Sequence, residues 1–250
     1  MEALLPDGVS LSVAALLVVT SFFTSAITAA LAMGGGLTLL AVMGMFLPVS
    51  VLVPVHGLVQ LGSNTGRAVA LKNDIEWGTL GLFFVFGLIG AVLAAYIVIE
   101  LPDAWLRVTL GLFVVLIVWV KLPAIAAKSR WLVAFGGFVT SALTMFLGAT
   151  GPLVVALFSK HFDRKEALIA TSAAAMVFQH GVKVFAFGVL GFAFLQWLPL
   201  VGAMIVSGFL GTLTGIKLLR RLPEARFRLL LKIMITLLGA DMIRRGWLAL

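Results

Sequence analysis

The stretch that decides the fold is V-H-G-L-V-Q-L-G-S-N-T-G-R, residues 55–67, which lies inside an otherwise apolar segment. Four of its polar side chains, those of His56, Gln60, Asn64 and Arg67, follow at steps of four, four and three residues. This spacing predicts a helix that carries all of them on one face. In lipid, an ionisable side chain is costly unless it has a partner or lies in a water-filled cavity. We therefore predict that this face lines a substrate path.

The composition predicts that the surroundings are lipid. Of the 250 residues, 62% are hydrophobic and 11% are charged, and the mean hydropathy is +1.18. Soluble domains carry roughly 25% charged residues, and apolar runs such as 80–99 are too long for a water-soluble core. A β-barrel would show short segments of alternating polarity instead. We predict an all-α polytopic membrane protein with a single transmembrane domain over residues 1–250.

Several residue types and motifs are missing, and their absence narrows the function. The chain has no cysteine, no P-loop and no zinc-protease or serine-hydrolase motif. The N-terminus lacks the basic region of a cleaved signal peptide. The net charge of +8 comes from cations between apolar segments, where they report topology rather than binding of nucleic acid. We expect no enzyme activity, cofactor or metal. Because no carboxylate lies in the middle of a predicted span, we expect an anionic solute.

The predicted helical segments repeat along the chain. The first half contains segments 10–31, 37–47, 48–71, 79–99 and 104–120, and the second contains 131–147, 153–159, 165–190, 197–219 and 225–243. The stretch E-L-P-D-A-W-L-R-V-T-L at 100–110 matches R-L-P-E-A-R-F-R-L-L-L at 221–231. We predict two repeats, at about 9–122 and 130–246.

The distribution of Lys and Arg predicts the orientation in the membrane. The cation-rich loops are 121–130, 160–165 and 217–228, and placing them all in the cytoplasm leaves both termini outside. Each repeat then has an odd number of segments, so the two copies are inverted. Arg244 and Arg245 end up outside, against the rule.

Two of the predicted segments are too short to cross a bilayer, which takes about 20 residues. Segments 37–47 and 153–159 each follow a glycine-rich break, and we predict re-entrant hairpins with unwound tips. Uncovered backbone N–H groups and positive helix ends at these tips would bind an anion. The predicted binding residues there are Gly34, Gly35, Gly36, Thr38, Thr150 and Gly151. The alternative is that the glycines serve only close helix packing.

The segment 165–190 carries a second polar face, made by Thr171, Ser172, Gln179, His180 and Lys183. In the repeat alignment Asn64 corresponds to Gln179, and Arg67 falls one place from Lys183. Inversion places Arg67 toward the cytoplasm and Lys183 toward the outside, so an anion meets a cation at either mouth. Arginine suits an oxyanion because its fork donates two parallel hydrogen bonds. Alternatively, both cations snorkel to the membrane interface.

The histidines allow two roles. His56, which corresponds to Thr171, and His180 exchange protons near neutral pH and would couple transport to protons, or they act as neutral hydrogen-bond donors. Both roles stay open. His161 lies in the charged loop 160–165, where we expect a solvated side chain.

The order of these motifs resembles the TauE/SafE permeases, the sulfite exporter family. The resemblance is carried by G-G-G at 34–36, H-G-x-x-Q-x-x-S-N-x-x-R at 56–67, G-x-T-G-P at 148–152 and Q-H-x-x-K at 179–183. It covers residues 12–245, including both L-P-[DE]-A-x-x-R stretches.

The resemblance implies transport of sulfite, organosulfonates or related sulfur-containing anions, usually outward across the bacterial inner membrane. We therefore expect a secondary transporter that works by alternating access as a monomer or homodimer. Its partners would be a small anion, the lipid bilayer and, if transport is coupled, protons. An anion channel, a permease for another small organic anion and a membrane scaffold remain alternatives.

Overall fold

The structure is a computed structural model that describes residues 5–6, 8–31, 34–98, 102–120, 129–218 and 224–250. The described residues form helices and connecting turns. The helices are α1 (Leu11–Leu31), α2 (Gly35–Gly44), α3 (Val49–Ala70), α4 (Trp77–Val98), α5 (Asp103–Trp119), α6 (Arg130–Leu147), α7 (Gly151–Phe158), α8 (Lys165–Val189), α9 (Leu198–Leu218) and α10 (Glu224–Trp247), with 3-10 turns at Lys72–Asp74 and Phe194–Trp197.

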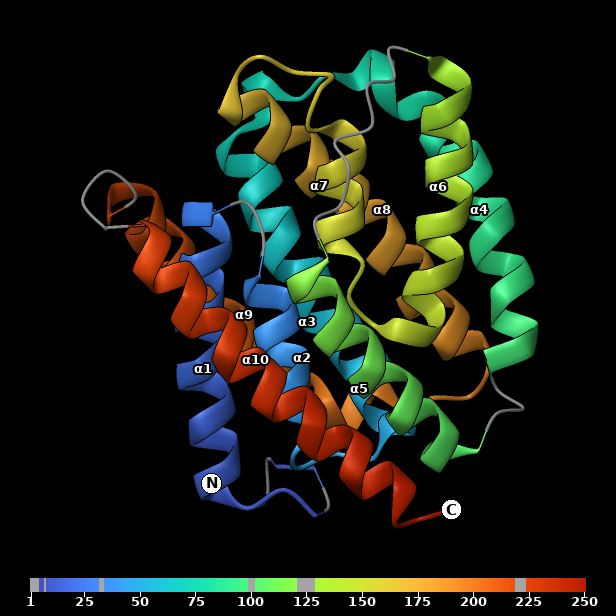
Figure 1. The fold of residues 1–250 in the computed structure, drawn as a ribbon, viewed down its shortest axis with the longest axis vertical. Coiled ribbons are helices and arrows are strands. Elements are labelled where there is room, and N and C mark those ends of the chain that lie inside the picture. The colour runs from blue at the N-terminus through green and yellow to red at the C-terminus, as the bar shows by residue number, and fades with distance from the viewer. Residues whose placement is uncertain (1–4, 7, 32–33, 99–101, 121–128, 219–223) are drawn as a thin grey trace.

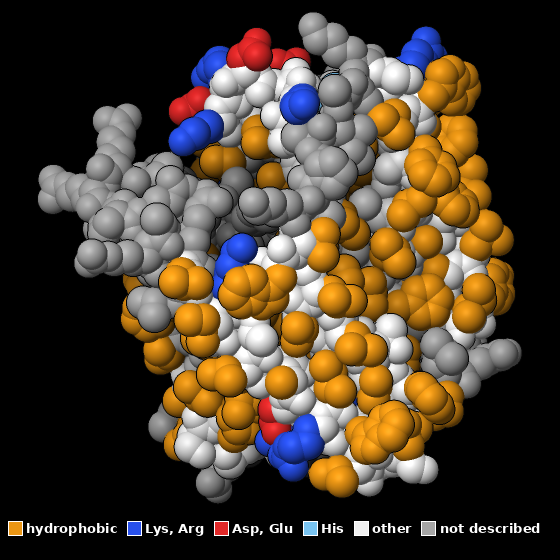
Figure 2. Space-filling model, in the orientation of Figure 1, with side chains coloured by type: hydrophobic (Ala, Val, Ile, Leu, Met, Phe, Trp, Pro, Cys, Tyr) orange, Lys and Arg blue, Asp and Glu red, His pale blue; other side chains and the backbone are white. Residues whose placement is uncertain are grey.

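The prediction of an all-helical membrane protein is confirmed. Five helices within the described ranges, among them α1, α4, α6 and α8, are long and apolar enough to cross a membrane. Large apolar side chains such as Tyr96, Leu116 and Phe135 point outward, and Figure 2 shows hydrophobic side chains spread over the same face as α4, α5 and α6. In hydrocarbon only a helix or a closed barrel satisfies its own backbone. Helices with apolar outer faces therefore suit a multi-pass membrane protein.

The helices of the two halves pack on one another in a regular way (Figure 1). The first helix of each half packs on the fourth helix of the other, giving the pairs α1–α9 and α4–α6. The third helices pair as α3–α8 and the fifth helices as α5–α10. Helix α1 begins and α10 ends at the same end of the molecule, the lower end in Figure 1. We call this the terminal end.

Close glycine contacts fix the register of the two cross-half pairs. A Cβ on Gly90 of α4 would collide with the backbone of Phe138 on α6, and a Cβ on Gly211 of α9 would collide with that of Phe22 on α1. The backbones at these crossings therefore approach closely because no side chain intervenes.

The two predicted short helices are present as α2 and α7. The chain turns sharply before each of them, at Gly34 with φ 98° and at Gly148 with φ 73°. A residue with a Cβ is strained at such angles, so these glycines set the positions of the two breaks. A Cβ on Gly148 would also meet Leu40 of α2 at 2.9 Å, which brings the second break against the first short helix.

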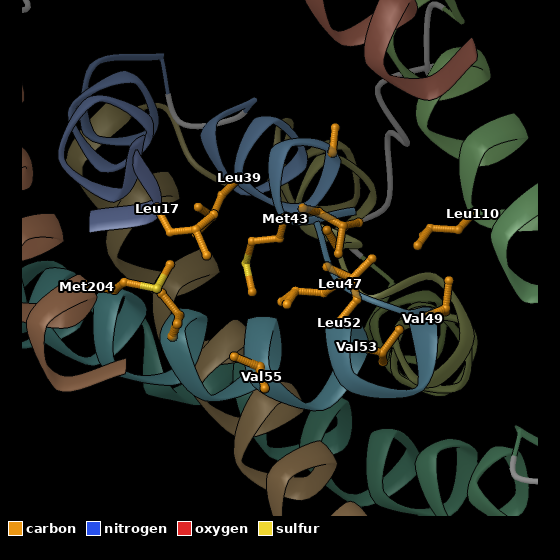
Figure 3. Close-up of a cluster of buried hydrophobic side chains, with 14 of the residues drawn as sticks. Leu17, Leu39, Met43, Leu47, Val49, Leu52, Val53, Val55, Leu110 and Met204 are labelled. Atoms are coloured by element: carbon orange, nitrogen blue, oxygen red, sulfur yellow. The ribbon is translucent and has the colours of Figure 1, made fainter. Parts of the chain in front are cut away.

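Helix α2 is held in the core by apolar side chains (Figure 3). Its Leu39 and Met43 belong to one buried cluster with Leu17 of α1, Leu52 of α3 and Met204 of α9. This packing seats α2 among long helices of both halves, so its N-terminus lies inside the protein.

The C-terminal end of α2 is held by two arginines near the terminal end. Arg107 of α5 donates to the carbonyls of Gly44 and Leu47 at 3.0 and 3.2 Å, and Arg245 of α10 donates to that of Met45 at 2.9 Å. Cations favour helix C-termini because the last carbonyls lack partners. Arg245, in the last turn of α10, therefore has a structural role at the end of α2.

Candidate functional site

A small polar cavity lies where the two glycine breaks meet. Its volume is about 30 Å³, which leaves room for about two water molecules. The first half lines it with Gly34, Gly36, Gln60, Asn64 and Arg67, and the second half lines it with Gly151 and His180. The structure thus brings together seven of the predicted site residues, from both halves of the chain.

Hydrogen bonds along one face of α3 hold its polar side chains in place beside this cavity. The His56 Nε2–H donates to the Gly36 carbonyl at 3.0 Å. The Gln60 amide nitrogen lies 3.3 Å from the same ring nitrogen, which cannot accept while it donates, so this amide is left to the cavity. The Asn64 side chain donates to the Gln60 carbonyl at 2.8 Å and accepts from Arg67 at 2.8 Å.

Arg67 is the cation of the cavity. Its side chain is 3% exposed, and its Nε finds no hydrogen-bond partner. A guanidinium has five N–H donors, and in Arg67 one N–H of the Nη1 group donates to the Asn64 side-chain oxygen. No salt bridge to Arg67 forms within the described ranges. A buried cation with unused donors beside a cavity is equipped to bind an anion.

The starts of α2 and α7 face the same cavity. Neither helix has a side-chain cap on its first turn, after Gly34 or after Thr150. The first N–H groups of a helix lack intrahelical partners and carry the positive end of the helix dipole. Gly36 and Gly151 therefore add uncapped helix ends to the surroundings of Arg67.

Three other residues of the breaks contact the protein rather than the cavity. Gly35 lies so close to α1 that a Cβ there would collide with the Thr24 carbonyl. The Thr38 hydroxyl donates to the Gly34 carbonyl at 3.0 Å, which secures the first turn of α2. Thr150 is buried at the start of α7 without a side-chain bond to that helix.

The polar face of α8 is mostly engaged in packing. Thr171 accepts a hydrogen bond from the Glu76 N–H at 3.0 Å, and Gln179 donates to the hydroxyls of Thr140 and Ser141 on α6 at 2.8 and 3.1 Å. The hydroxyl of Ser172 is buried with no partner. These residues do not line the cavity. His180 does, and its ring centroid lies 6.3 Å from that of His56.

Lys183 is buried like Arg67 but lies outside the lining of this cavity. Its side chain is 0% exposed, and its Nζ donates to the Gly148 carbonyl at 2.8 Å. Neither cation snorkels to an interface, because both are enclosed by protein.

Five residues that line the cavity were not among the predicted site residues. They are Thr28, Leu37, Ala149, Pro152 and Met176. A signal for Met176 was present in the sequence. Met176, His180 and Lys183 follow at steps of four and three residues, as Gln60, Asn64 and Arg67 do on α3. An apolar side chain in a hydrophobic segment, however, gives no indication of a binding site. Within the described ranges, no group of three or more His, Asp or Glu is placed to hold a metal ion.

His161 is only partly solvated, because its side chain is half-buried. Its ring lies against Phe158 and Phe162, with centroids 6.2 and 6.1 Å away. Burial lowers the pKa of His161 from its usual value. The ring therefore packs, partly buried, against the C-terminal end of α7.

Comparisons with known proteins support these observations. The family model described as sulfite exporter TauE/SafE matches residues 17–242. A probable inner membrane transporter protein, TsaS of Comamonas testosteroni, is 23% identical over 184 residues, which cover 70% of this chain and 75% of that protein. No solved structure matches the chain. The matched region includes both breaks, the whole cavity and both buried cations, and the chain belongs to the sulfite exporter TauE/SafE family of membrane transporters.

Proposed function

We propose that this transporter moves a small sulfur-containing oxyanion, such as sulfite or a sulfonate, by alternating access between two inverted repeats. Arg67 is the residue that binds the negative charge, with the Gln60 amide and the uncapped starts of α2 and α7 around it. The observation that carries the proposal is the buried Arg67 guanidinium, which faces a cavity with an unpartnered Nε. The family description names sulfite, and the oxyanion matches the donors.

The contacts between the halves support an inverted repeat. If each helix is replaced by the helix in the same position of the other half, the α1–α9 pair becomes the α6–α4 pair. The same replacement leaves the α3–α8 and α5–α10 pairs unchanged. Phe22 on α1 meets the glycine of α9 as Phe138 on α6 meets the glycine of α4. In this register Gly35, the first residue of α2, corresponds to Gly151, the first residue of α7. The same register pairs Arg67 with Lys183 directly, without the one-place shift that the sequence alignment required.

The membrane potential supplies a direction. A potential that is negative inside favours exit of an anion by about 2.3 kcal/mol per charge per 100 mV. Outward transport thus runs without a coupling ion. Coupling to protons through His56 or His180 remains a second mode of the same proposal.

The cavity volume supports a carrier rather than an open channel. Room for about two waters beside Arg67 gives no continuous pore in this conformation. A carrier must instead change conformation for each anion it moves.

The test is flux in proteoliposomes with sulfite, sulfate, thiosulfate, sulfoacetate and taurine. We expect saturable movement of at least one sulfur oxyanion. Arg67→Ala should reduce its flux by about 10- to 100-fold, because a hydrogen bond to a charged group is worth about 1.5–3 kcal/mol. Arg130→Ala, which removes an exposed arginine beside Trp131, is the matched control and should leave flux unchanged. Preferred movement of a neutral or cationic solute would reject the proposal, and large single-molecule currents would favour a channel.

A further inference from the structure

A second and larger cavity opens at the terminal end. Its volume is about 310 Å³, and its walls come from the starts of α3 and α5 and the ends of α6 and α8. Phe146, Phe187 and Phe192 give it a largely apolar lining. We call this cavity the vestibule and the polar cavity beside Arg67 the anion cavity.

A single layer of residues separates the vestibule from the anion cavity. On α8, His180 lines the anion cavity, Lys183 lies one turn further on, and Phe187 lines the vestibule another turn beyond. At the end of α6, Phe146 lines the vestibule, and Gly148 comes just before the cavity-lining residues of the second break. Both elements therefore cross from one cavity to the other at Lys183 and Gly148.

Helix α3 crosses the same layer. Val53 lines the vestibule and Gln60 lines the anion cavity, with His56 between them. His56 is 0% exposed, and its ring lies nearly perpendicular to that of His180, with the centroids 6.3 Å apart. Three separate elements thus place His56, Lys183 and Gly148 in one layer between the cavities.

The layer is closed by a hydrogen bond. The Lys183 Nζ donates to the Gly148 carbonyl at 2.8 Å, and the aliphatic part of the side chain lies over Gly57 of α3. No carboxylate in the described ranges forms a salt bridge with this lysine. A lysine buried in the membrane with only a neutral acceptor is an expensive arrangement that points to a role in the path.

We propose that Lys183 is the gate between the vestibule and the anion cavity, and that the vestibule is the second half of the substrate path. The bond to Gly148 closes the path. An oxyanion in either cavity draws the amino group away because a charged oxygen accepts a stronger hydrogen bond than a neutral carbonyl. This inference rests on the proposed anion transport and assigns Lys183 a role in passage, distinct from the binding role of Arg67.

The one carboxylate in the vestibule wall does not oppose entry of an anion. Asp103 accepts a hydrogen bond from the Ser50 N–H at 2.9 Å, and its other oxygen lies 3.5 Å from the Arg107 guanidinium. Its charge is thereby balanced at the start of α3.

The absence of cysteine in the chain allows a direct test with single cysteines. Ser50→Cys reports on the vestibule, and Met176→Cys reports on the anion cavity. The probe is 2-sulfonatoethyl methanethiosulfonate, a small anion that does not cross membranes. It is applied to intact cells and to inverted vesicles, and the preparation in which Ser50→Cys reacts identifies the side on which the vestibule opens.

From the vestibule side, Met176→Cys should react more slowly than Ser50→Cys. Lys183→Met should raise the rate at Met176→Cys by about tenfold or more, because the closing bond involves a charged donor worth about 1.5–3 kcal/mol. Lys183→Arg, which keeps a cation, should raise it less. Equal rates at Met176→Cys with Lys183 and with Lys183→Met would overturn the proposal, and so would a rate at Met176→Cys that already equals that at Ser50→Cys.

Two further variants serve as a control and as a substitute for Lys183→Met. Lys232→Met removes a lysine that lies over Trp119 on the α5–α10 pair, and it should change neither rate. An equal rise with Lys232→Met would mean general loosening and would overturn the gate. If Lys183→Met does not insert, Gly57→Ala replaces it, because a Cβ there would meet the Lys183 side chain at 2.8 Å and displace it. An unchanged rate at Met176→Cys in that variant would likewise overturn the gate.

Labelling and flux separate the two proposals. The expected labelling without flux of any anion in the panel would reject the transport function and leave the barrier at Lys183 in place. Anion flux with labelling that does not depend on Lys183 would reject the gate and leave the transport function.

Discussion

Arg67 on α3 and Lys183 on α8 are both buried cations, but they have different surroundings. Arg67 is bonded to Asn64 and faces the anion cavity with an unpartnered Nε. Lys183 is bonded to the Gly148 carbonyl and lies outside the lining of that cavity. The difference comes from the neighbouring backbone, because the turn at Gly148 leaves a carbonyl where Lys183 can reach it. A buried cation binds a solute only where the protein does not already supply its acceptor.

The largest expected effect compares removal of the two cations. Arg67→Met should raise the half-saturating anion concentration by about 10- to 100-fold, because it removes charged donors at the site. Lys183→Met should leave the half-saturating concentration nearly unchanged and alter the maximal flux instead. The measurement is initial flux as a function of anion concentration in proteoliposomes. Equal rises in half-saturation for both variants would show that the two cations share one binding role.

The second expected effect concerns the backbone that Lys183 contacts. Gly148→Ala should reduce stability by about 1–2 kcal/mol because of its positive φ, and by more because the new methyl would meet Leu40 at 2.9 Å. Gly191→Ala is the matched control, since its φ of 91° is similar and nothing lies within 4 Å. The measurement is thermal unfolding in detergent. A Gly148→Ala protein as stable as Gly191→Ala would contradict close packing at the second break.

A smaller effect is expected at the helix that faces Lys183. Gly57→Ala should displace the lysine side chain and shift maximal flux in the same direction as Lys183→Met, but less strongly. Gly181→Ala is the control on α8, because its new methyl would meet only Leu61 at an ordinary 3.9 Å. Maximal flux at saturating anion is the readout. If the two alanine variants behave alike, contact with Lys183 is not the cause.

The smallest effect concerns a predicted binding residue that the structure uses for packing. Thr171→Val should reduce stability by about 0.5–1.5 kcal/mol by removing the acceptor for the Glu76 N–H. It should leave the half-saturating anion concentration unchanged. Thermal unfolding and flux measured on the same preparation check both parts. A marked loss of anion affinity in this variant would show that Thr171 takes part in anion binding.

The sequence by itself determined the helical membrane fold, the two glycine breaks and the polar face of α3. These features depend on local rules, because lipid forces each segment to satisfy its own backbone and a period of 3.6 residues sorts side chains onto faces. Glycine at positive φ is likewise a local requirement, so the positions of α2 and α7 could be predicted to within a few residues.

Only the tertiary structure decided which of the polar residues share a cavity. Thr171 and Gln179 looked equivalent to the residues of α3, yet Glu76, Thr140 and Ser141 take their hydrogen bonds. Met176 also lines the cavity, although its apolar side chain gave no sign of this in the sequence. The physical reason is that a hydrogen-bonding group serves whichever partner comes within about 3 Å, and partners far away in the chain are fixed by helix packing rather than by local sequence.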